Sequence, residues 1–230
     1  MRGLFVAAGL LSALVALTVA GPAGATNECR GLNPCVKVAG PWVVVPTGRT
    51  APRPQVQYQL TCPRRFIVGG TDAELTDQSI DLAFLGSSGA PVSPGVTTSR
   101  TVVFVASYVG DQPRAPTFRP HIGCIPATGG GTRTPTGVRV IRPPGHPVTR
   151  RVVTGRVRGD STLVASCHAD EHMVGWYSAR GFSTPAPPDP ALVASLYTKT
   201  SVTRSSVSVL ARAGRGQGIV QVGAICAGGG

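Results

Sequence analysis

The sequence predicts an all-β protein made of two tandem β-sandwich-like modules, each stapled by a disulfide. Three observations predict this class. Glycine and proline are abundant, at 30 and 21 residues, and short runs of valine, isoleucine and threonine, typical of strands, lie between them. Six cysteines bracket two stretches of similar length. Several landmarks also recur at one nearly fixed offset, which is the signature of an internal repeat.

The first 25 residues are predicted to be a cleavable signal peptide. Arg2 supplies the positive start, residues 4–20 form an almost unbroken apolar run, and Ala23-Gly24-Ala25 offers a cleavage site of small residues. The run is short for a membrane anchor, and no later segment is apolar for long enough to span a bilayer. We therefore expect a secreted protein, or one associated with the cell envelope, without a transmembrane segment in the mature chain.

The chain is strongly basic although few of its residues are charged. The formal net charge is +12, charged residues make up 14% of the chain, and Lys37 and Lys199 are the only lysines. Arginine therefore carries nearly all of the positive charge. A GC-rich coding sequence would favour arginine over lysine, but it would not explain the shortage of acidic residues.

All six cysteines follow the predicted cleavage site, and an even number in an exported chain indicates disulfides. They are Cys29, Cys35, Cys62, Cys124, Cys167 and Cys226. The layout favours a tight Cys29–Cys35 loop, with Cys62–Cys124 and Cys167–Cys226 each closing one half. In the chain-entropy model, a closed loop of about 60 residues stabilises the fold by roughly 4 kcal/mol. A metal site is the alternative, but the chain has no Cys-x-x-Cys pair, and we expect neither a metal nor another cofactor.

The cysteines also carry the predicted repeat. Cys167 follows Cys62 by 105 residues, Cys226 follows Cys124 by 102, and Val138-Arg139-Val140 follows Val36-Lys37-Val38 by 102. Segments rich in valine and glycine resemble one another easily by chance, whereas matching cysteine spacing is not explained in that way. We therefore predict a duplication with these segments: signal peptide 1–25, N-terminal disulfide loop 26–35, β module 36–127, Gly/Pro-rich linker 128–136, second β module 137–227 and tail 228–230.

Strands are indicated by alternation and by short apolar runs. Val56, Tyr58 and Leu60 fall on one face of a predicted strand, and Ile80, Leu82 and Phe84 do the same in another. The predicted buried strands lie at 42–45, 102–105 and 219–222. Pro and Gly clusters separate these segments, as in sandwiches and barrels. No segment predicts a helix, and residues 185–190 are expected to form a stiff loop.

Several of these motifs together resemble a group of exported proteins of GC-rich Gram-positive bacteria. The motifs are Cys29-x5-Cys35, Val38-Ala39-Gly40-Pro41-Trp42-Val43, Cys62-Pro63, Val68-Gly69-Gly70-x-Asp72, Ser93-Pro94-Gly95-Val96-Thr97-Thr98 and Gly123-Cys124-Ile125-Pro126. The second half is also similar to exported modules that begin at Cys-Pro, pass a Val-x-Gly-Gly turn and end in Ala-x-Cys-Ala. The resemblance covers most of the mature chain. It implies an exported location and a β architecture, and it carries no activity.

No catalytic constellation is found. The segment from Arg65 to Gly70 is similar to the activated amino terminus of trypsin-like proteases, but no matching nucleophile or base segment follows, so a strand ending in a glycine turn is expected. His168 and His172 would share a face on a helix and could bind a metal there, yet the segment reads as a loop. Asp72 is expected to bind local backbone, and Asp81 is expected to be exposed. Trp42 and Trp176 are expected in the core, and we assign no role to His121 or His146.

The charge distribution is the most informative functional feature. No acidic residue lies between Asp111 and Asp160, whereas nine arginines do. The candidate polyanion-binding residues are Arg133, Arg139, Arg142, Arg150, Arg151, Arg156 and Arg158. The guanidinium fork binds phosphate and carboxylate bidentately, so anionic cell-envelope polymers are the expected partners. Aromatic residues do not interleave with these arginines, which argues against nucleic acid. The alternative is a basic surface without a binding role.

The sequence therefore predicts a secreted, non-enzymatic protein that is associated with the envelope as a structural or polyanion-binding protein. Two alternatives stay open at this point. One is a secreted hydrolase with an unrecognised active site, which would need Asp72 or Asp81 to face another carboxylate. The other is a module that binds a small ligand or a peptide in an apolar groove between sheets.

Overall fold

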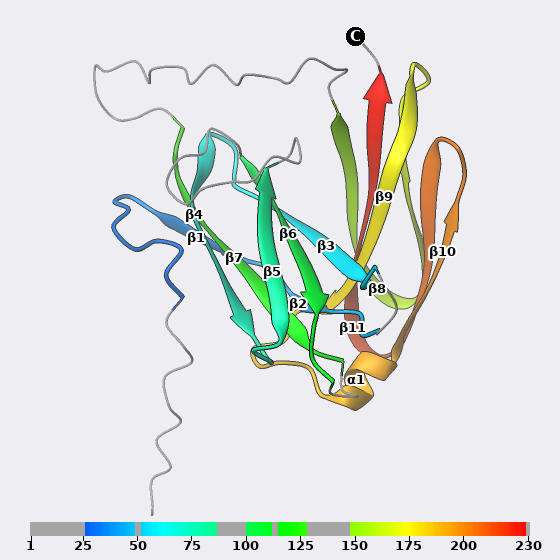
Figure 1. Cartoon of the computed structure of the whole chain (residues 1–230), viewed down its shortest axis with the longest axis horizontal. Coiled ribbons are helices and arrows are strands. Elements are labelled where there is room, and N and C mark those ends of the chain that lie inside the picture. Colours follow the sequence, from blue (N-terminus) through cyan, green and yellow to red (C-terminus); the bar gives the residue numbers. More distant parts are fainter. Residues whose placement is uncertain (1–25, 49–51, 87–99, 112–114, 128–147, 229–230) are drawn as a thin grey trace, which may run out of the picture.

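A computed structural model describes residues 26–48, 52–86, 100–111, 115–127 and 148–228 (Figure 1). The predicted signal peptide and the predicted linker lie outside these residues. The strands are β1 (Val36–Ala39), β2 (Trp42–Val44), β3 (Gln55–Thr61), β4 (Phe66–Leu75), β5 (Ile80–Gly86), β6 (Thr101–Tyr108), β7 (Thr117–Pro126), β8 (Thr149–Ser166), β9 (Glu171–Phe182), β10 (Leu196–Val202) and β11 (Ser206–Gly228). One short helix, α1 (Pro190–Ala194), precedes β10. The predicted all-β class is confirmed.

One antiparallel sheet runs through both halves of the molecule. Its strands follow the order β4-β7-β2-β9-β11-β8, and β1 pairs with β7 in line with β2. The half before residue 128 supplies β4, β7, β1 and β2, and the half after residue 147 supplies the remaining strands. A separate sheet, β3-β6-β5, covers the first half. Figure 1 shows the first half in blue to green and the second in yellow-green to red.

The second half makes its two layers from strands that bend. The register between β8 and β11 shifts between Ala213 and Gly218. Before the shift, β11 lies between β8 and β10; after it, β11 lies between β8 and β9. Because apolar side chains from both parts of β8 and β11 share one buried cluster, the bent ribbon forms both layers of the second core.

The two halves pair their strands in the same order and register. Leu60 pairs with Val102 as Ala165 pairs with Val207, an offset of 105 residues on both strands. A β-bulge interrupts β4 beside Cys124 and β9 beside Cys226 at the same place. Val36 and Thr149 occupy corresponding positions, opposite these two cysteines. Residues 138–140, which the sequence analysis matched to residues 36–38, lie outside the described residues. The duplication itself stays a prediction.

The two cores lie on opposite faces of the shared sheet. Val43 packs in the first core with Phe104 and Phe118, whereas its neighbour Val44 packs in the second core with Phe182. Adjacent side chains on a strand point to opposite faces, so β2 contributes to both cores. Each core is then covered by its own three-stranded layer.

The junction between the halves combines backbone pairing with one buried amide. Val43 of β2 pairs with Gly181 of β9, and Ala179 of β9 belongs to the first core. The carboxamide of Gln221 accepts a hydrogen bond from Gln59 N at 2.6 Å and donates one to Gln59 O at 3.0 Å. Gln59 lies on β3, an edge strand whose main-chain groups would otherwise be unpaired. The second half therefore closes the open edge of the first.

The three predicted disulfides are confirmed. They join Cys29 to Cys35, Cys62 to Cys124 and Cys167 to Cys226, and no described cysteine is free. In each half the longer bridge links the residue that follows one outer strand (β3 or β8) to the last strand of that half (β7 or β11). No helix in the described ranges has the length and apolar character needed to cross a membrane.

Three local expectations were wrong. No helix was expected, but the loop expected at 185–190 ends in a one-turn helix that begins at Pro190, because the Asp189 side chain accepts a hydrogen bond from Leu192 N and caps it. Gly69 and Gly70 form no turn; β4 continues through them to Leu75 as a bulge. Trp176 is 45% exposed, although Trp42 is buried as expected. β2 pairs with β9 only at residues 181–182, so among the described strands β2 does not extend along β9 as far as Trp176.

We expect Gln221→Ala to lower the free energy of unfolding by about 2–4 kcal/mol, because it leaves the partly buried N–H and C=O of Gln59 without the Gln221 partner. Gln217→Ala is the matched control, since Gln217 makes only a 3.4 Å exposed contact with Arg158; it should change the same quantity by less than about 0.5 kcal/mol. Denaturant unfolding measures both. Equal effects of the two substitutions would show that Gln221 does not close the junction.

Candidate functional site

The structure describes four of the seven candidate arginines and gives them different surroundings. Arg133, Arg139 and Arg142 lie outside the described residues. Arg150 Nη1 donates to Gln57 Oε1 at 2.8 Å, and its guanidinium lies 5.7 Å from the centroid of the Tyr177 ring. Because Gln57 belongs to β3 and Tyr177 to β9, Arg150 is part of the junction between the halves. Its guanidinium is therefore occupied by contacts within the protein.

Two tyrosines share this junction with Arg150. Burial raises the pKa of Tyr58 to about 12 and the pKa of Tyr177 to about 12. Both phenols therefore stay protonated at physiological pH. The Tyr177 ring lies against Gly223, where a Cβ atom would overlap the ring, so the close approach of β9 and β11 requires glycine.

Arg151 is also bound within the protein. Its guanidinium forms two hydrogen bonds with the Glu171 carboxylate, at 2.8 and 2.6 Å, and Glu171 also accepts one from His168 N. These bonds lower the pKa of Glu171 to about 2. Residues 167–170 form a loop and turn, as expected, so His168 and His172 do not share a helix face. Glu171 lies near Cys167 and Cys226, but those sulfurs are bonded to each other and are not thiolate ligands.

Arg156 and Arg158 are exposed on one face of β8, on either side of the buried Val157. Two further exposed arginines, Arg212 and Arg215, lie at the bend of β11, next to this part of β8. Arg158 contacts Gln217, and Arg212 forms two short hydrogen bonds with Asp160, at 2.6 and 2.7 Å. We call these four arginines the arginine corner.

The sequence identified only part of the arginine corner. Arg156 and Arg158 belong to the acid-free stretch, whereas Arg212 and Arg215 come more than 50 residues later. The antiparallel register of β8 and β11 brings the two pairs together. Only the register of these two strands assigns Arg212 and Arg215 to the same cluster as Arg156 and Arg158. Asp160 neutralises part of the charge, and the remaining guanidinium groups face solvent.

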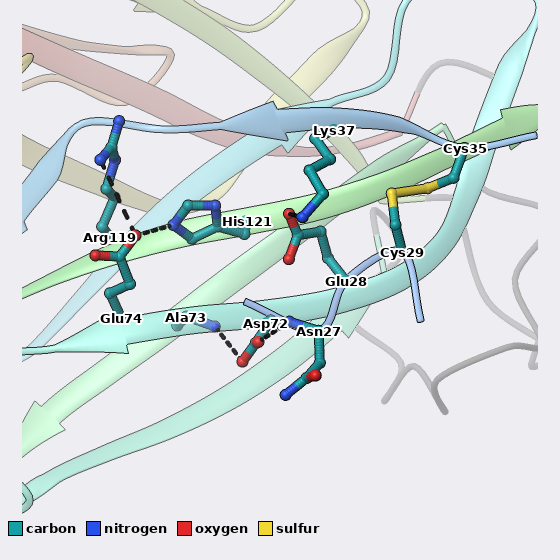
Figure 2. A network of polar contacts seen from close by, with 10 residues as sticks. All are labelled: Asn27, Glu28, Cys29, Cys35, Lys37, Asp72, Ala73, Glu74, Arg119 and His121. Atoms are coloured by element: carbon teal, nitrogen blue, oxygen red, sulfur yellow. Dashed lines mark hydrogen bonds and ion pairs between the residues drawn. A yellow bond between two sulfur atoms is a disulfide. The ribbon is translucent and has the colours of Figure 1, made fainter. Parts of the chain in front are cut away.

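A second polar surface covers the outer face of β4 and β7 (Figure 2). Glu74 Oε1 lies 2.8 Å from Nε2 of His121 and 4.0 Å from Nη1 of Arg119. Arg119 also donates to Gly40 O at 3.2 Å, and its guanidinium lies 6.0 Å from the centroid of Trp42. His121, to which the sequence assigned no role, is buried and has this carboxylate as its partner. A single histidine among prolines gave no sequence signal for that contact.

The N-terminal disulfide loop is seated on the same face. Asn27 N donates to Asp72 Oδ2, and Ala73 N donates to Asp72 Oδ1 at 2.8 Å, which is the structural role expected for Asp72. The main chain of Glu28 lies directly over Gly70 and Gly123, where any Cβ atom would overlap it. Lys37 Nζ then pairs with the buried Glu28 carboxylate at 3.3 Å (Figure 2). These contacts explain why β4 and β7 carry glycine at those two positions.

A cleft of about 660 Å³ lies where the halves meet, beside Arg119. Tyr58, Leu60 and Ile219 contribute apolar surface to it, and residues 39–41 and 183–185 form its other walls. Arg119 is the one charged side chain in this lining. Asp72 lies outside this lining and accepts hydrogen bonds from main-chain N–H groups, and Asp81 is exposed on β5, as expected.

We expect acid to remove the contribution of Glu171 to stability. Its folded pKa of about 2 is below its ordinary value of 4.5, so the contribution is complete above about pH 4.5 and is lost as the pH falls towards 2. Glu171→Gln should therefore flatten the fall in unfolding free energy across that range. Asp170→Asn is the control, because it leaves the Arg151 contacts in place. An unchanged pH profile for Glu171→Gln would contradict this assignment.

No family model, no curated protein and no solved structure matches this chain.

Proposed function

We propose that this protein is exported and binds anionic polymers of the cell envelope through the arginine corner, without catalysing a reaction. The observation that carries the proposal is the exposed cluster of Arg156, Arg158, Arg212 and Arg215 at the bend of β8 and β11. Arg156, Arg158 and Arg215 offer planar guanidinium groups on a disulfide-stapled ribbon that can bind repeated phosphate or carboxylate groups bidentately. The fork of Arg212 is already bonded to the Asp160 carboxylate.

The distribution of charge supports the same proposal. In the described first half, seven basic residues are nearly matched by six acidic ones, whereas the described second half has nine basic residues and four acidic ones. Among the described residues, most of the excess positive charge therefore lies in the half that carries the arginine corner. A positively charged surface of this kind attracts polyanions, and this attraction weakens as salt screens the charges.

Two features support an exported location. Three disulfides are typical of proteins that fold outside a reducing cytosol. The first 25 residues also have the pattern of a cleavable signal peptide. An oxidised, compact β scaffold would hold the arginines in place outside the cell.

A second candidate function rests on the cleft at the junction. Its apolar lining and its single arginine suit a small ligand that carries one carboxylate. Arg119→Gln should then abolish any rise in melting temperature that a small carboxylic acid produces in the unmodified protein. A rise that persists in Arg119→Gln would place the ligand elsewhere.

We expect Arg156→Gln/Arg158→Gln to weaken binding to anionic surfaces. Each basic residue near such a surface contributes about 1 kcal/mol, so losing two should weaken binding by about 30-fold at low salt. The matched control is Arg53→Gln/Arg64→Gln, which removes the same charge from exposed sites in the first half. Retention of the mature protein on polyglycerol-phosphate beads, and on phosphatidylglycerol vesicles, measures the effect for a wall polymer and for a lipid surface.

The same assay contains the result that would overturn the proposal. Retention should fall steeply as salt rises from about 50 mM to about 500 mM, because the contacts are exposed and screened. Retention that does not change with salt, or that falls equally in both double variants, would exclude specific binding through the arginine corner.

A further inference from the structure

A groove of about 420 Å³ lies in the second half, where its two layers come together at β9 and β10. β9 belongs to one layer and β10 to the other, and Figure 1 shows them as the neighbouring yellow and orange strands. The fully buried Val209 and Val220 are part of its lining, so the groove reaches the second core. We call it the β9–β10 groove. It shares no described lining residue with the cleft beside Arg119.

Three alternate residues of β9 give this groove its polar side. Trp176, Ser178 and Arg180 line it, and their partners on β11 belong to the second core. Residues opposite each other on paired strands point to the same face, so these three side chains project on the side of that core. Thr198 of β10 adds a hydroxyl from the other layer. Trp176 is exposed, so its indole ring is accessible to a ligand.

Arg180 is the one charged side chain in the described lining of the β9–β10 groove. Its Nη1 donates to Leu196 O at 2.8 Å, so the half-buried guanidinium reaches from β9 to the start of β10. Within the described residues this is the only hydrogen bond of its side chain, and no acidic group pairs with it. Burial lowers the pKa of Arg180 below its ordinary value, but the group stays charged. A guanidinium offers five N–H donors, so the others are available to an anion.

The architecture of a half does not require an arginine at this position. Arg180 lies opposite Val220, and at the matching register position of the first half Leu75 lies opposite Phe118. In the first half, β4 leads to β5 through residues 76–79, whereas residues 183–195, which include α1, separate β9 from β10. The arginine is therefore a feature of the β9–β10 groove and is not shared by the corresponding strands of the first half.

We propose that the β9–β10 groove binds a small monocarboxylate that carries a planar apolar ring, with the carboxylate on Arg180 and the ring against Trp176. The guanidinium fork matches a carboxylate in shape and charge. A single cation in the lining suits a single negative charge, whereas a phosphate monoester carries nearly two at neutral pH. The indole ring of Trp176 offers a flat surface on which another ring can stack. The hydroxyls of Ser178 and Thr198 can bond to polar groups of the ligand.

Isothermal titration calorimetry with the full mature protein tests the proposal. The probe is 3-phenylpropanoate, and 3-phenylpropanamide is its matched neutral control, because the amide keeps the ring and the shape and lacks the charge. The native protein should bind the acid at one site and the amide about tenfold more weakly or less, since hydrogen bonds to a charged group are the stronger ones. Phenyl phosphate should bind no more tightly than the acid.

Two substitutions locate the site. Arg180→Gln and Trp176→Ala should each weaken the binding of 3-phenylpropanoate about tenfold. Tyr197→Ala is the matched control for Trp176→Ala, because Tyr197 is an exposed aromatic residue of β10 outside the groove lining, and it should leave the affinity unchanged. Cooperative thermal unfolding shows that each variant is folded. The comparison of acid with amide uses the native protein and does not depend on any variant.

Several results would overturn the proposal. They are binding of 3-phenylpropanoate weaker than about 1 mM, equal affinity for the acid and the amide, tighter binding of phenyl phosphate, or native affinity in folded Arg180→Gln.

Two further comparisons separate this site from the others. Arg119 already has Glu74 at 4.0 Å, whereas Arg180 has no acidic partner among the described residues, so binding should persist in Arg119→Gln and be lost in Arg180→Gln. The reverse result would assign the ligand to the cleft at the junction and overturn the proposal. Arg180→Gln should also keep its retention on polyglycerol-phosphate beads, because the arginine corner is unchanged. The proposed polymer binding and this inference can therefore fail separately.

Discussion

The pairing of β2 with β9 is the contact on which the rest of the structure depends. It joins the sheets of the two halves, so Val43 and Val44 face different cores although they are neighbours in sequence. The pairing needs a close approach, because Gly181 lies where a Cβ atom would overlap the carbonyl of Trp42. Gln221 completes it by satisfying the main chain of Gln59, which lies 162 residues away. Each longer disulfide then stabilises one half of a continuous structure.

The junction also decides which charges are available at the surface. Arg150 is used between the halves and Arg151 is used by Glu171, so neither is free for a partner. Arg156 and Arg158, further along β8, remain exposed. At corresponding register positions the second half carries an amide and an alanine where the first half carries Arg119 and Glu74. Ala179 and Gln221 thus lie at the junction, where Arg150 is also bound.

Much of the fold could be predicted because its signals are local. Alternation located β3, with Val56, Tyr58 and Leu60 buried, and cysteine spacing gave all three bridges. The contacts that were missed join residues far apart in sequence and leave no periodic pattern, as with Gln59 and Gln221. Arg150 looks like surface charge until β3 is placed beside it. Trp176 looks like core until the end of β2 is known, because burial there depends on which strand is the neighbour.

The most direct test of this account uses its two tryptophans, since Trp42 lies in the first half and Trp176 in the second. Trp42→Phe and Trp176→Phe each leave one fluorescent reporter, and denaturant unfolding can be followed from each half with the disulfides intact. A shared sheet predicts that both reporters give the same midpoint and the same slope, because the halves unfold as one cooperative unit. Two separate transitions, one for each half, would contradict it.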